Sequence, residues 1–342
     1  MTSKHMMRRA LIMALLVQAG FAHAQGAAAV ERLRQASASN AIDDAQMKPW
    51  HLKLSFQLFD PKGVATEKGT VEEWWAGPLM HQTVYTSPSY TGTEVRTKDG
   101  LYRTKGASSA PDLLRLILLQ VVHPMPSEED IASSKPALRT LTFGKGKFDC
   151  IMLDQALKNV VDPPLGLFPT YCFDHDFDTL RISLDFVSQS TIRNDIGKFL
   201  GHSVPISQTT SFGSVNAITA HLESLETMTG EPDFAPSADL EKVNPNLVKV
   251  SSNLVKGARI GGIDPIYPQR ARQNHVSGSV LISAVIGRDG RVHSMKLISA
   301  PDSDLAIAAL AAVRQWIYKP YLLNGEPTEV QTTVTANFKF GP

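Results

Sequence analysis

The first long patterned stretch of the chain alternates hydrophobic and polar residues. Within HLKLSFQLF, residues 51–59, every second position from Leu52 to Leu58 is leucine or phenylalanine. A period of two is typical of a β-strand that buries one face. A turn at residues 60–63, a hairpin at Asp99-Gly100 and further alternating segments to about residue 230 predict a large antiparallel sheet.

One segment interrupts this alternation. Residues 111–122, PDLLRLILLQVV, are hydrophobic almost all round a helix, with Pro111 suited to the first turn and Pro124 ending it. Such a helix must be buried on most sides or cover an apolar surface, and it is too short to span a membrane. The pattern therefore predicts an open sheet curved around a buried helix. Residues 25–46 predict a short leading helix.

The C-terminal quarter has a different order of elements. A short helix follows Pro268, and two alternating segments, GSVLISAVI and VHSMKLIS, surround a turn at residues 288–290. Asp302 or Ser303 can cap a helix that Pro320 cannot continue. After the tight-turn pair Asn324-Gly325, EVQTTVTANFKF predicts a final strand.

This order resembles the C-terminal domain of TonB over residues 257–341. The matching pieces are Tyr267-Pro268 with Ala271, Gly278-Ser279-Val280, Asp289-Gly290-Arg291-Val292, Trp316, Lys319-Pro320, Asn324-Gly325 and Phe338. The resemblance implies a small α+β domain with a three-stranded antiparallel sheet and two helices. It also implies a periplasmic interaction module that grips an extended segment of an outer-membrane transporter as an added strand.

Carried onto this chain, the resemblance places the gripping surface on two parts of the domain, the segment before the short helix and the final strand. The implied partner-binding residues are Asp264, Pro265, Ile266, Tyr267, Pro268, Val330, Thr332, Val334 and Phe338. The alternative is that Tyr267, Trp316 and Phe338 only fill the core.

Residues 45–230 are similar to periplasmic lipoprotein-carrier (LolA-like) domains. The resemblance lies in the succession TYCFD, LRISLDF, NDIGKF and GHSVP, followed by a long alternating strand. It implies an antiparallel half-barrel whose concave apolar face, partly plugged by helices, holds acyl chains. The candidate lipid-binding residues are Leu52, Leu54, Phe56, Leu114, Ile117 and Leu118.

The N-terminus has the form of a secretory signal. Three basic residues precede the apolar run ALIMALLVQAGFA, and Ala22-His23-Ala24 has the small-x-small form of a cleavage site. We expect residues 1–24 to be a signal peptide and the mature chain to be periplasmic. The alternative is an uncleaved anchor in the inner membrane, facing the periplasm. Energy-transducing TonB proteins keep such an anchor and a long Pro-rich linker, so force transmission does not follow from the resemblance alone.

The chain contains two cysteines, Cys150 and Cys172. Both lie in segments that read as strands, joined by a Pro-Pro-Gly-type loop, and adjacent antiparallel strands can bring two cysteines within bridging distance. An oxidising compartment favours a disulfide between them. The alternative is two buried free thiols.

The remaining chemistry is sparse. The formal net charge of +1 and the absence of basic runs argue against nucleic acid. No nucleophile elbow, zinc motif or phosphate loop is present. The acidic run at residues 174–178 lacks the glycine of a calcium loop and reads as a solvated turn rather than a metal site. We therefore expect no cofactor and no enzymatic activity, with an unrecognised hydrolase as the remaining alternative.

These signals divide the chain into a signal peptide (1–24), a LolA-like domain (25–230), a linker (231–256) and a TonB-like domain (257–342). We expect a TonB-family protein that binds an outer-membrane transporter or other envelope partner, with a role in energy-dependent transport. The alternative is a carrier for lipid or lipoprotein that uses the TonB-like domain to dock.

Overall fold

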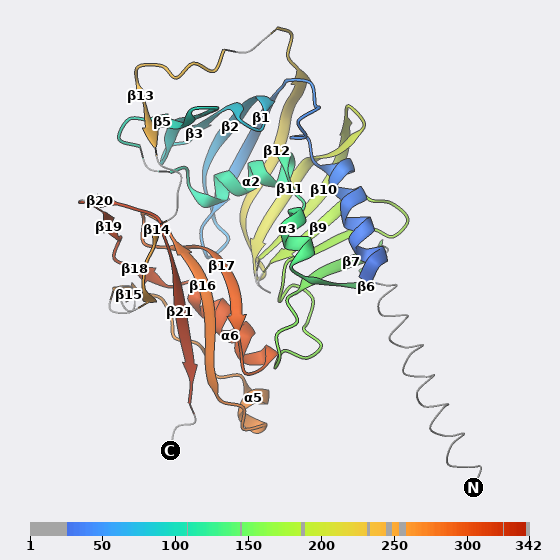
Figure 1. The fold of residues 1–342 in the computed structure, drawn as a ribbon, viewed down its shortest axis with the longest axis vertical. Coiled ribbons are helices and arrows are strands. Elements are labelled where there is room, and N and C mark those ends of the chain that lie inside the picture. Colours follow the sequence, from blue (N-terminus) through green and yellow to red (C-terminus); the bar gives the residue numbers. More distant parts are fainter. Residues whose placement is uncertain are drawn as a thin grey trace.

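The computed structural model describes residues 26–339, apart from 108, 144–145, 186–188, 231–232, 244–247, 253–257 and 324. The expected signal peptide lies outside the described residues. Of the helices in the described part of the chain, none has the length and hydrophobicity needed to cross a bilayer. The protein is mostly β, as the alternating pattern predicts (Figure 1).

The first domain is built on a 13-stranded antiparallel sheet in the order β13-β5-β4-β3-β2-β1-β12-β11-β10-β9-β8-β7-β6. Its strands are β1 (Trp50–Phe59), β2 (Ala65–Gly77), β3 (Met80–Thr86), β4 (Thr91–Thr97), β5 (Gly100–Thr104), β6 (Lys135–Phe143), β7 (Gly146–Asp154), β8 (Thr170–Asp174), β9 (Leu180–Asp185), β10 (Gln189–Phe199), β11 (His202–Phe212), β12 (Val215–Thr227) and β13 (Leu240–Val243). The hairpin expected at Asp99-Gly100 joins β4 to β5.

The sheet curves around the apolar helix α2 (Asp112–Val122) (Figure 1). The buried side chains of α2 pack against the inward-facing residues of β1, β11 and β12, because alternation puts one apolar face of each strand on the same side. A helix at residues 26–40 and the short helix α3 (Glu128–Ala132) lie over the β7–β9 end of the sheet (Figure 1). The expected helix inside a curved antiparallel sheet is therefore present.

The expected disulfide is confirmed. Cys150 in β7 and Cys172 in β8 are direct cross-strand partners and are bonded to each other. Both are buried. The acidic turn after β8 is held by Arg32 of the helix at residues 26–40, whose guanidinium donates to the carbonyl oxygens of Asp174 and Phe177.

The C-terminal domain has a four-stranded sheet in the order β14-β21-β16-β17. Its elements are β14 (Val248–Lys249), β15 (Arg259–Gly261), α5 (Gln269–Gln273), β16 (Gly278–Ile286), β17 (Val292–Ser299), α6 (Ser303–Val313), β18 (Ile317–Tyr318), β19 (Leu322–Leu323), β20 (Glu326–Pro327) and β21 (Val330–Phe338).

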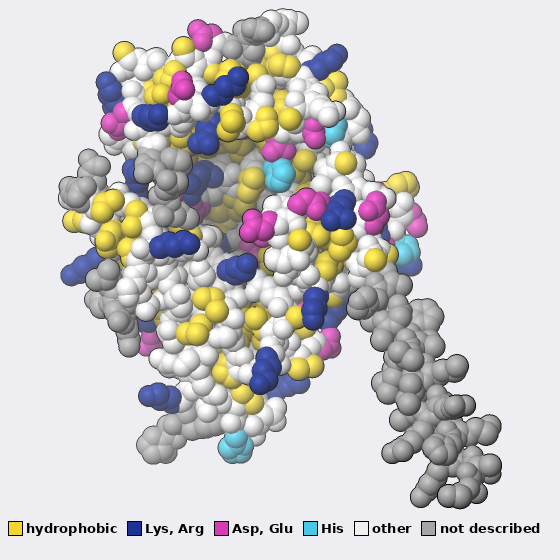
Figure 2. All heavy atoms as spheres, in the orientation of Figure 1, with side chains coloured by type: hydrophobic (Ala, Val, Ile, Leu, Met, Phe, Trp, Pro, Cys, Tyr) yellow, Lys and Arg dark blue, Asp and Glu magenta, His cyan; other side chains and the backbone are white. Residues whose placement is uncertain are grey.

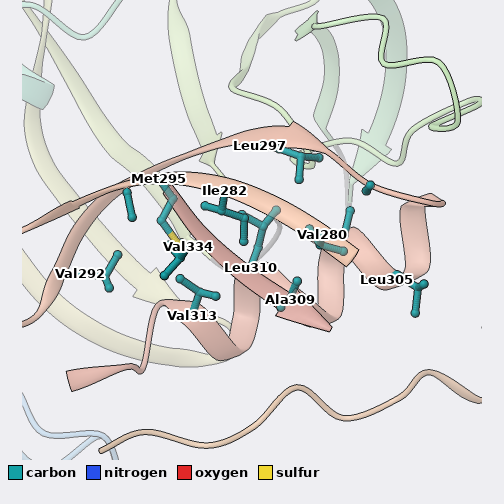
Figure 3. Close-up of a cluster of buried hydrophobic side chains, with 14 of the residues drawn as sticks. Val280, Ile282, Val292, Met295, Leu297, Leu305, Ala309, Leu310, Val313 and Val334 are labelled. Atoms are coloured by element: carbon teal, nitrogen blue, oxygen red, sulfur yellow. The ribbon is translucent and has the colours of Figure 1, made fainter. Parts of the chain in front are cut away.

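Helix α6 covers one face of this sheet (Figure 3). Asp302 caps its start by accepting a hydrogen bond from the Leu305 amide at 2.8 Å. Leu310 and Val313 of the helix point at Ile282 and Val334 of the sheet (Figure 3). Trp316 lies just beyond the end of the helix and is buried.

The sheet has one strand more than the three expected. Strand β14 comes from the segment read as a linker and pairs in parallel with the start of β21, while β13, from the same segment, pairs with β5 of the first domain. Strand β14 forms because Val248-Lys249-Val250 alternates apolar and polar residues, which suits the open edge of β21. Three residues are too few for this alternation to predict a strand from the sequence.

The two domains pack against each other. Apolar residues of the loop at 155–169, among them Leu167 and Phe168, belong to the same buried cluster as the C-terminal core. Arg314, after α6, lies with its guanidinium 4.6 Å from the ring centre of Phe212 in β11 and bonds to Gln189 in β10. On the face of the molecule drawn in Figure 2, the surface is hollowed between the domains, and acidic and basic side chains lie around the hollow.

Candidate partner-binding edge

One edge of the C-terminal sheet is only partly covered. Strand β21 is paired along its whole length with β16 on one side. On the other side, Val248 pairs with Val330, Lys249 pairs with Gln331, and the Val250 amide donates to the Gln331 carbonyl oxygen at 3.0 Å. In the described part of the chain no strand pairs with this edge beyond Gln331.

The open part of the edge exposes backbone donors and acceptors. The N–H and C=O of one strand residue point to the same side, and the side changes at each residue. Because the Gln331 carbonyl faces β14, the backbone groups of Thr333, Thr335 and Asn337 face the same, open edge. An extended segment added there would satisfy these groups and leave the pairing of β21 with β16 in place.

The side chains of β21 that were expected to bind a partner point away from the open edge. Val330, Thr332, Val334 and Phe338 all point to the α6 side and are at most 7% exposed. Their contribution to an added strand would come from holding β21 straight, since only the backbone of this strand reaches the edge. The sequence predicted this strand, but it does not show which backbone groups stay unpaired.

The segment at residues 264–268 lies on the surface and is fixed by three contacts. The Trp316 indole N–H donates to the Ile263 carbonyl oxygen at 2.8 Å. The Arg259 guanidinium lies 4.4 Å from the Trp316 ring centre and 2.6 Å from the Asp264 carboxylate. These contacts hold the start of the segment against the domain.

Tyr267 joins this segment to the end of β21. Its ring meets the Phe338 ring edge-on, with 5.6 Å between ring centres, and its hydroxyl donates to the Val276 carbonyl oxygen. Ile266, next to it, is 79% exposed. Because the Tyr267 and Phe338 rings touch, the structure brings together the two parts of the surface that the resemblance implies. Pro268 forms the N-terminal cap position of α5.

An apolar cavity of about 160 Å³ lies at the other end of the edge, where β21 begins. It is lined by Val330, Ile286, Tyr318 and the segment at residues 319–322, together with Ala258. Leu322 is 56% exposed. In Figure 2, hydrophobic side chains gather on the flank of the molecule where Figure 1 shows β19 and β20. No local pattern in the sequence indicates this cavity, because its walls come from segments that lie far apart along the chain.

A cluster of charged groups joins the C-terminal domain to α2. His293 of β17 has Nδ1 at 3.0 Å from Asp112 and 3.5 Å from Glu329, and Nε2 at 3.0 Å from Asp289. Arg115 of α2 lies 3.9 Å from Glu329. Burial opposes the charged imidazolium, but the surrounding carboxylates outweigh it and raise the pKa of His293 to about 11.

We expect His293→Gln to lower the free energy of unfolding by about 2 kcal/mol at pH 6. Glutamine is neutral, so the variant lacks the positive charge that lies between the three carboxylates. The folded-state pKa lies above the ordinary value of 6.5, so this contribution is complete below pH 6.5 and is lost as the pH rises toward 11. Urea unfolding of both proteins at several pH values measures it. His221→Gln, on the exposed side of β12, is the control. A constant difference from pH 6 to pH 10 would contradict the assignment.

The candidate lipid-binding residues all lie in one place. Leu52, Leu54, Phe56, Leu114, Ile117 and Leu118 form part of a single buried cluster between the sheet and α2, and none is more than 8% exposed. The concave face of the sheet is thus filled by the helix. An acyl chain could reach the leucine and isoleucine side chains of this set only if α2 moved.

Polar side chains of the sheet hold α2 in place. Gln208 of β11 donates to the Ile117 carbonyl oxygen at 2.7 Å, and Arg193 of β10 bonds to the Gln120 side chain. Arg193 is 2% exposed, and its burial lowers the pKa of its guanidinium to about 9. These anchors were not evident from the sequence, because they join residues more than 70 positions apart.

Comparisons with known proteins give matches to the C-terminal part of the chain and to solved structures. The family of the Gram-negative bacterial TonB protein C-terminal matches residues 264–340. The TonB protein of Vibrio cholerae is 28% identical over 78 residues, which is 22% of this chain and 32% of that protein. The chain therefore spans about a third of the length of this curated relative.

Solved structures also match the chain. A LolA superfamily protein from Nitrosomonas europaea has 9% sequence identity and a TM-score of 0.41, covering 62% of this chain and 98% of its own. A putative outer membrane lipoprotein-sorting protein domain from Vibrio parahaemolyticus has 10% identity and a TM-score of 0.34, covering 60% and 94%. The family match bears out the resemblance to the TonB C-terminal domain expected from the sequence, and a LolA superfamily protein is among the solved structures that match the chain.

Proposed function

We propose that this protein is a periplasmic TonB-family adaptor without enzymatic activity. It binds an extended segment of an outer-membrane transporter, or of another envelope protein, through its C-terminal domain. The observation that carries the proposal is the open edge of β21, where Thr333, Thr335 and Asn337 direct their backbone groups outward. The match of residues 264–340 to the TonB C-terminal family supports this use of the domain.

The geometry favours recognition by backbone rather than by deep side-chain pockets. Each of the three outward residues offers one donor and one acceptor, and main-chain hydrogen bonds of this kind supply affinity in strand addition. Side chains next to the edge then select the partner. Ile266 is exposed beside one end of β21, and the apolar cavity lies at the other. A partner segment would therefore be extended, with apolar residues that can reach these two places.

Calorimetric titration of the full chain with synthetic peptides tests the proposal. The peptides would be the periplasm-facing extended segments of outer-membrane transporters from the same genome. We expect saturable binding by at least one peptide, and loss of this binding when alternate amides of that peptide are N-methylated. N-methylation removes the donors that an added strand uses. Binding that survives N-methylation, or no binding across the whole panel, would count against strand addition.

A second candidate function is lipid or lipoprotein binding by the first domain. The observation that favours it is α2, an apolar helix lying in the concave face of an open sheet, where it covers apolar side chains of β1. Displacing α2 would uncover the leucine and phenylalanine side chains of β1. The C-terminal domain would then serve to dock the carrier to an envelope partner.

For this candidate, we expect the full chain to bind a fluorescent fatty acid, and Gln208→Leu to bind it several-fold more tightly. Leucine cannot donate to the Ile117 carbonyl oxygen, so α2 should leave the sheet more easily. Fluorescence titration measures both affinities. Gln35→Leu, on the exposed side of the helix at residues 26–40, is the matched control. Equal affinities of the two variants would show that α2 is not the gate, and no binding by any of the proteins would contradict the carrier function.

A further inference from the structure

The chain occupies the beginning of its own partner-binding edge. Residues 248–250 run parallel to β21, beside Val330 and Gln331, and their pairing includes the 3.0 Å hydrogen bond from the Val250 amide to the Gln331 carbonyl oxygen. The open backbone groups of β21 begin two residues further on, at Thr333. Residues 248–250 therefore lie where one end of an added strand would lie.

The side chains of this segment show what the edge accepts. Val248 pairs directly with Val330, whose side chain faces α6, so Val248 and Val250 face the same side. Both pack against the C-terminal core, whereas Lys249 is exposed. The edge thus accepts an extended segment in which two apolar residues flank one residue whose side chain is exposed.

The cavity described above extends the same preference. Its wall includes Val330 and Ile286, which pair with each other across β21 and β16, next to the position of Val248. A volume of about 160 Å³ leaves room for a side chain larger than valine near this position. The start of β21 therefore favours a partner residue that is apolar and bulky.

We propose that residues 248–250 are a built-in occupant of the edge, and that a partner segment displaces them. That segment is an extended peptide parallel to β21 with an apolar-x-apolar pattern at the positions of Val248 and Val250. The identity of the partner as an envelope protein rests on the function proposed above, but the occupancy of the edge does not. Because the occupant belongs to the same chain, its effective concentration is on the order of millimolar, and it competes strongly with any weak partner.

Displacement would also change the connection between the domains. Strand β13 ends at Val243 on the edge of the large sheet, and β14 begins at Val248 on the edge of the small one. The chain between these two residues is therefore tied at both ends. A partner that takes the place of residues 248–250 would free the second end.

The test uses the full chain and two peptides. One is a synthetic peptide with the sequence of residues 245–252, PNLVKVSS, and the other is the transporter peptide that binds best in the panel above. The variant Val248→Asn/Val250→Asn removes both apolar contacts of the segment, and Lys249→Asn, at the exposed residue between them, is the matched control. A second variant, Val250→Pro, removes the amide that bonds to Gln331 together with the Val250 side chain, and it leaves Val248 in place.

We expect both opened variants to bind the PNLVKVSS peptide at least about tenfold more tightly than the wild type, and Lys249→Asn to bind it like the wild type. Equal affinity of the wild type and both opened variants, including no binding by any of them, would overturn the inference. If the opened variants bind PNLVKVSS but no transporter peptide, the occupancy stands and the proposed function fails. If the transporter peptide binds the wild type and the opened variants equally, the proposed function stands and the occupancy fails.

Discussion

Replacing Thr335 by proline is expected to weaken partner binding by at least about 30-fold, which corresponds to about 2 kcal/mol. The Thr335 amide faces the open edge, so proline removes a donor that only a partner uses. The pyrrolidine ring also projects toward the incoming strand. The pairing of β21 with β16 should survive, because proline is tolerated where the N–H of an edge strand faces outward.

Titration of the best transporter peptide into Thr335→Pro and Thr335→Val separates this effect from a change of side chain. Valine keeps the amide and the β-propensity of threonine, so its affinity should stay within a few-fold of the wild type. Circular dichroism and a urea midpoint close to that of the wild type would show that the domain is folded. Undiminished binding by a folded Thr335→Pro would mean that the partner does not add to β21.

Removing the disulfide should have the largest effect on stability. Cys150 and Cys172 close a loop with a sequence separation of 22, and the loss of chain entropy in the unfolded state corresponds to about 3 kcal/mol. We expect the double variant Cys150→Ala/Cys172→Ala to lose about this amount in its free energy of unfolding. Both side chains are buried, and alanine is suitable there because its methyl group places no unpaired polar atom in the core.

Urea unfolding of the double variant and of the wild type, with and without a reductant, measures this contribution. The reduced wild type should resemble the double variant, since both lack the cross-link. A reductant should leave the double variant unchanged, which makes it the control for side effects of the reductant. If neither the reductant nor the substitutions shifted the midpoint, the bond would be absent from the protein in solution.

Much of the fold follows from local patterns in the sequence. The period-two alternation of β1, the hairpin at Asp99-Gly100 and the apolar helix at residues 111–122 each depend on neighbouring residues, and all are present. The paired cysteines followed from their places in two adjacent strands. In the C-terminal domain, the helix cap at Asp302 and the buried position of Trp316 also follow from residues close to them in the sequence.

The parts that escaped prediction depend on which distant segments meet. The cluster around His293 joins it to Asp112, far away in the sequence, and no local signal announces the pairing. Strand β14 has only two residues and exists because β21 offers it an edge. The candidate site shows the same limit: the sequence indicated β21, but its backbone direction, and thus the role of Thr335, requires the pairing register.

Hydrogen exchange at single-residue resolution, measured by NMR on the full chain with and without the transporter peptide, tests strand addition most directly. The amides of Thr333, Thr335 and Asn337 face the open edge and should exchange much more slowly once the peptide is bound. The amides of Val334 and Ala336 face β16 and should change little. Protection with this alternation is the predicted result. Peptide binding that leaves the three amides of the edge unprotected would contradict the account.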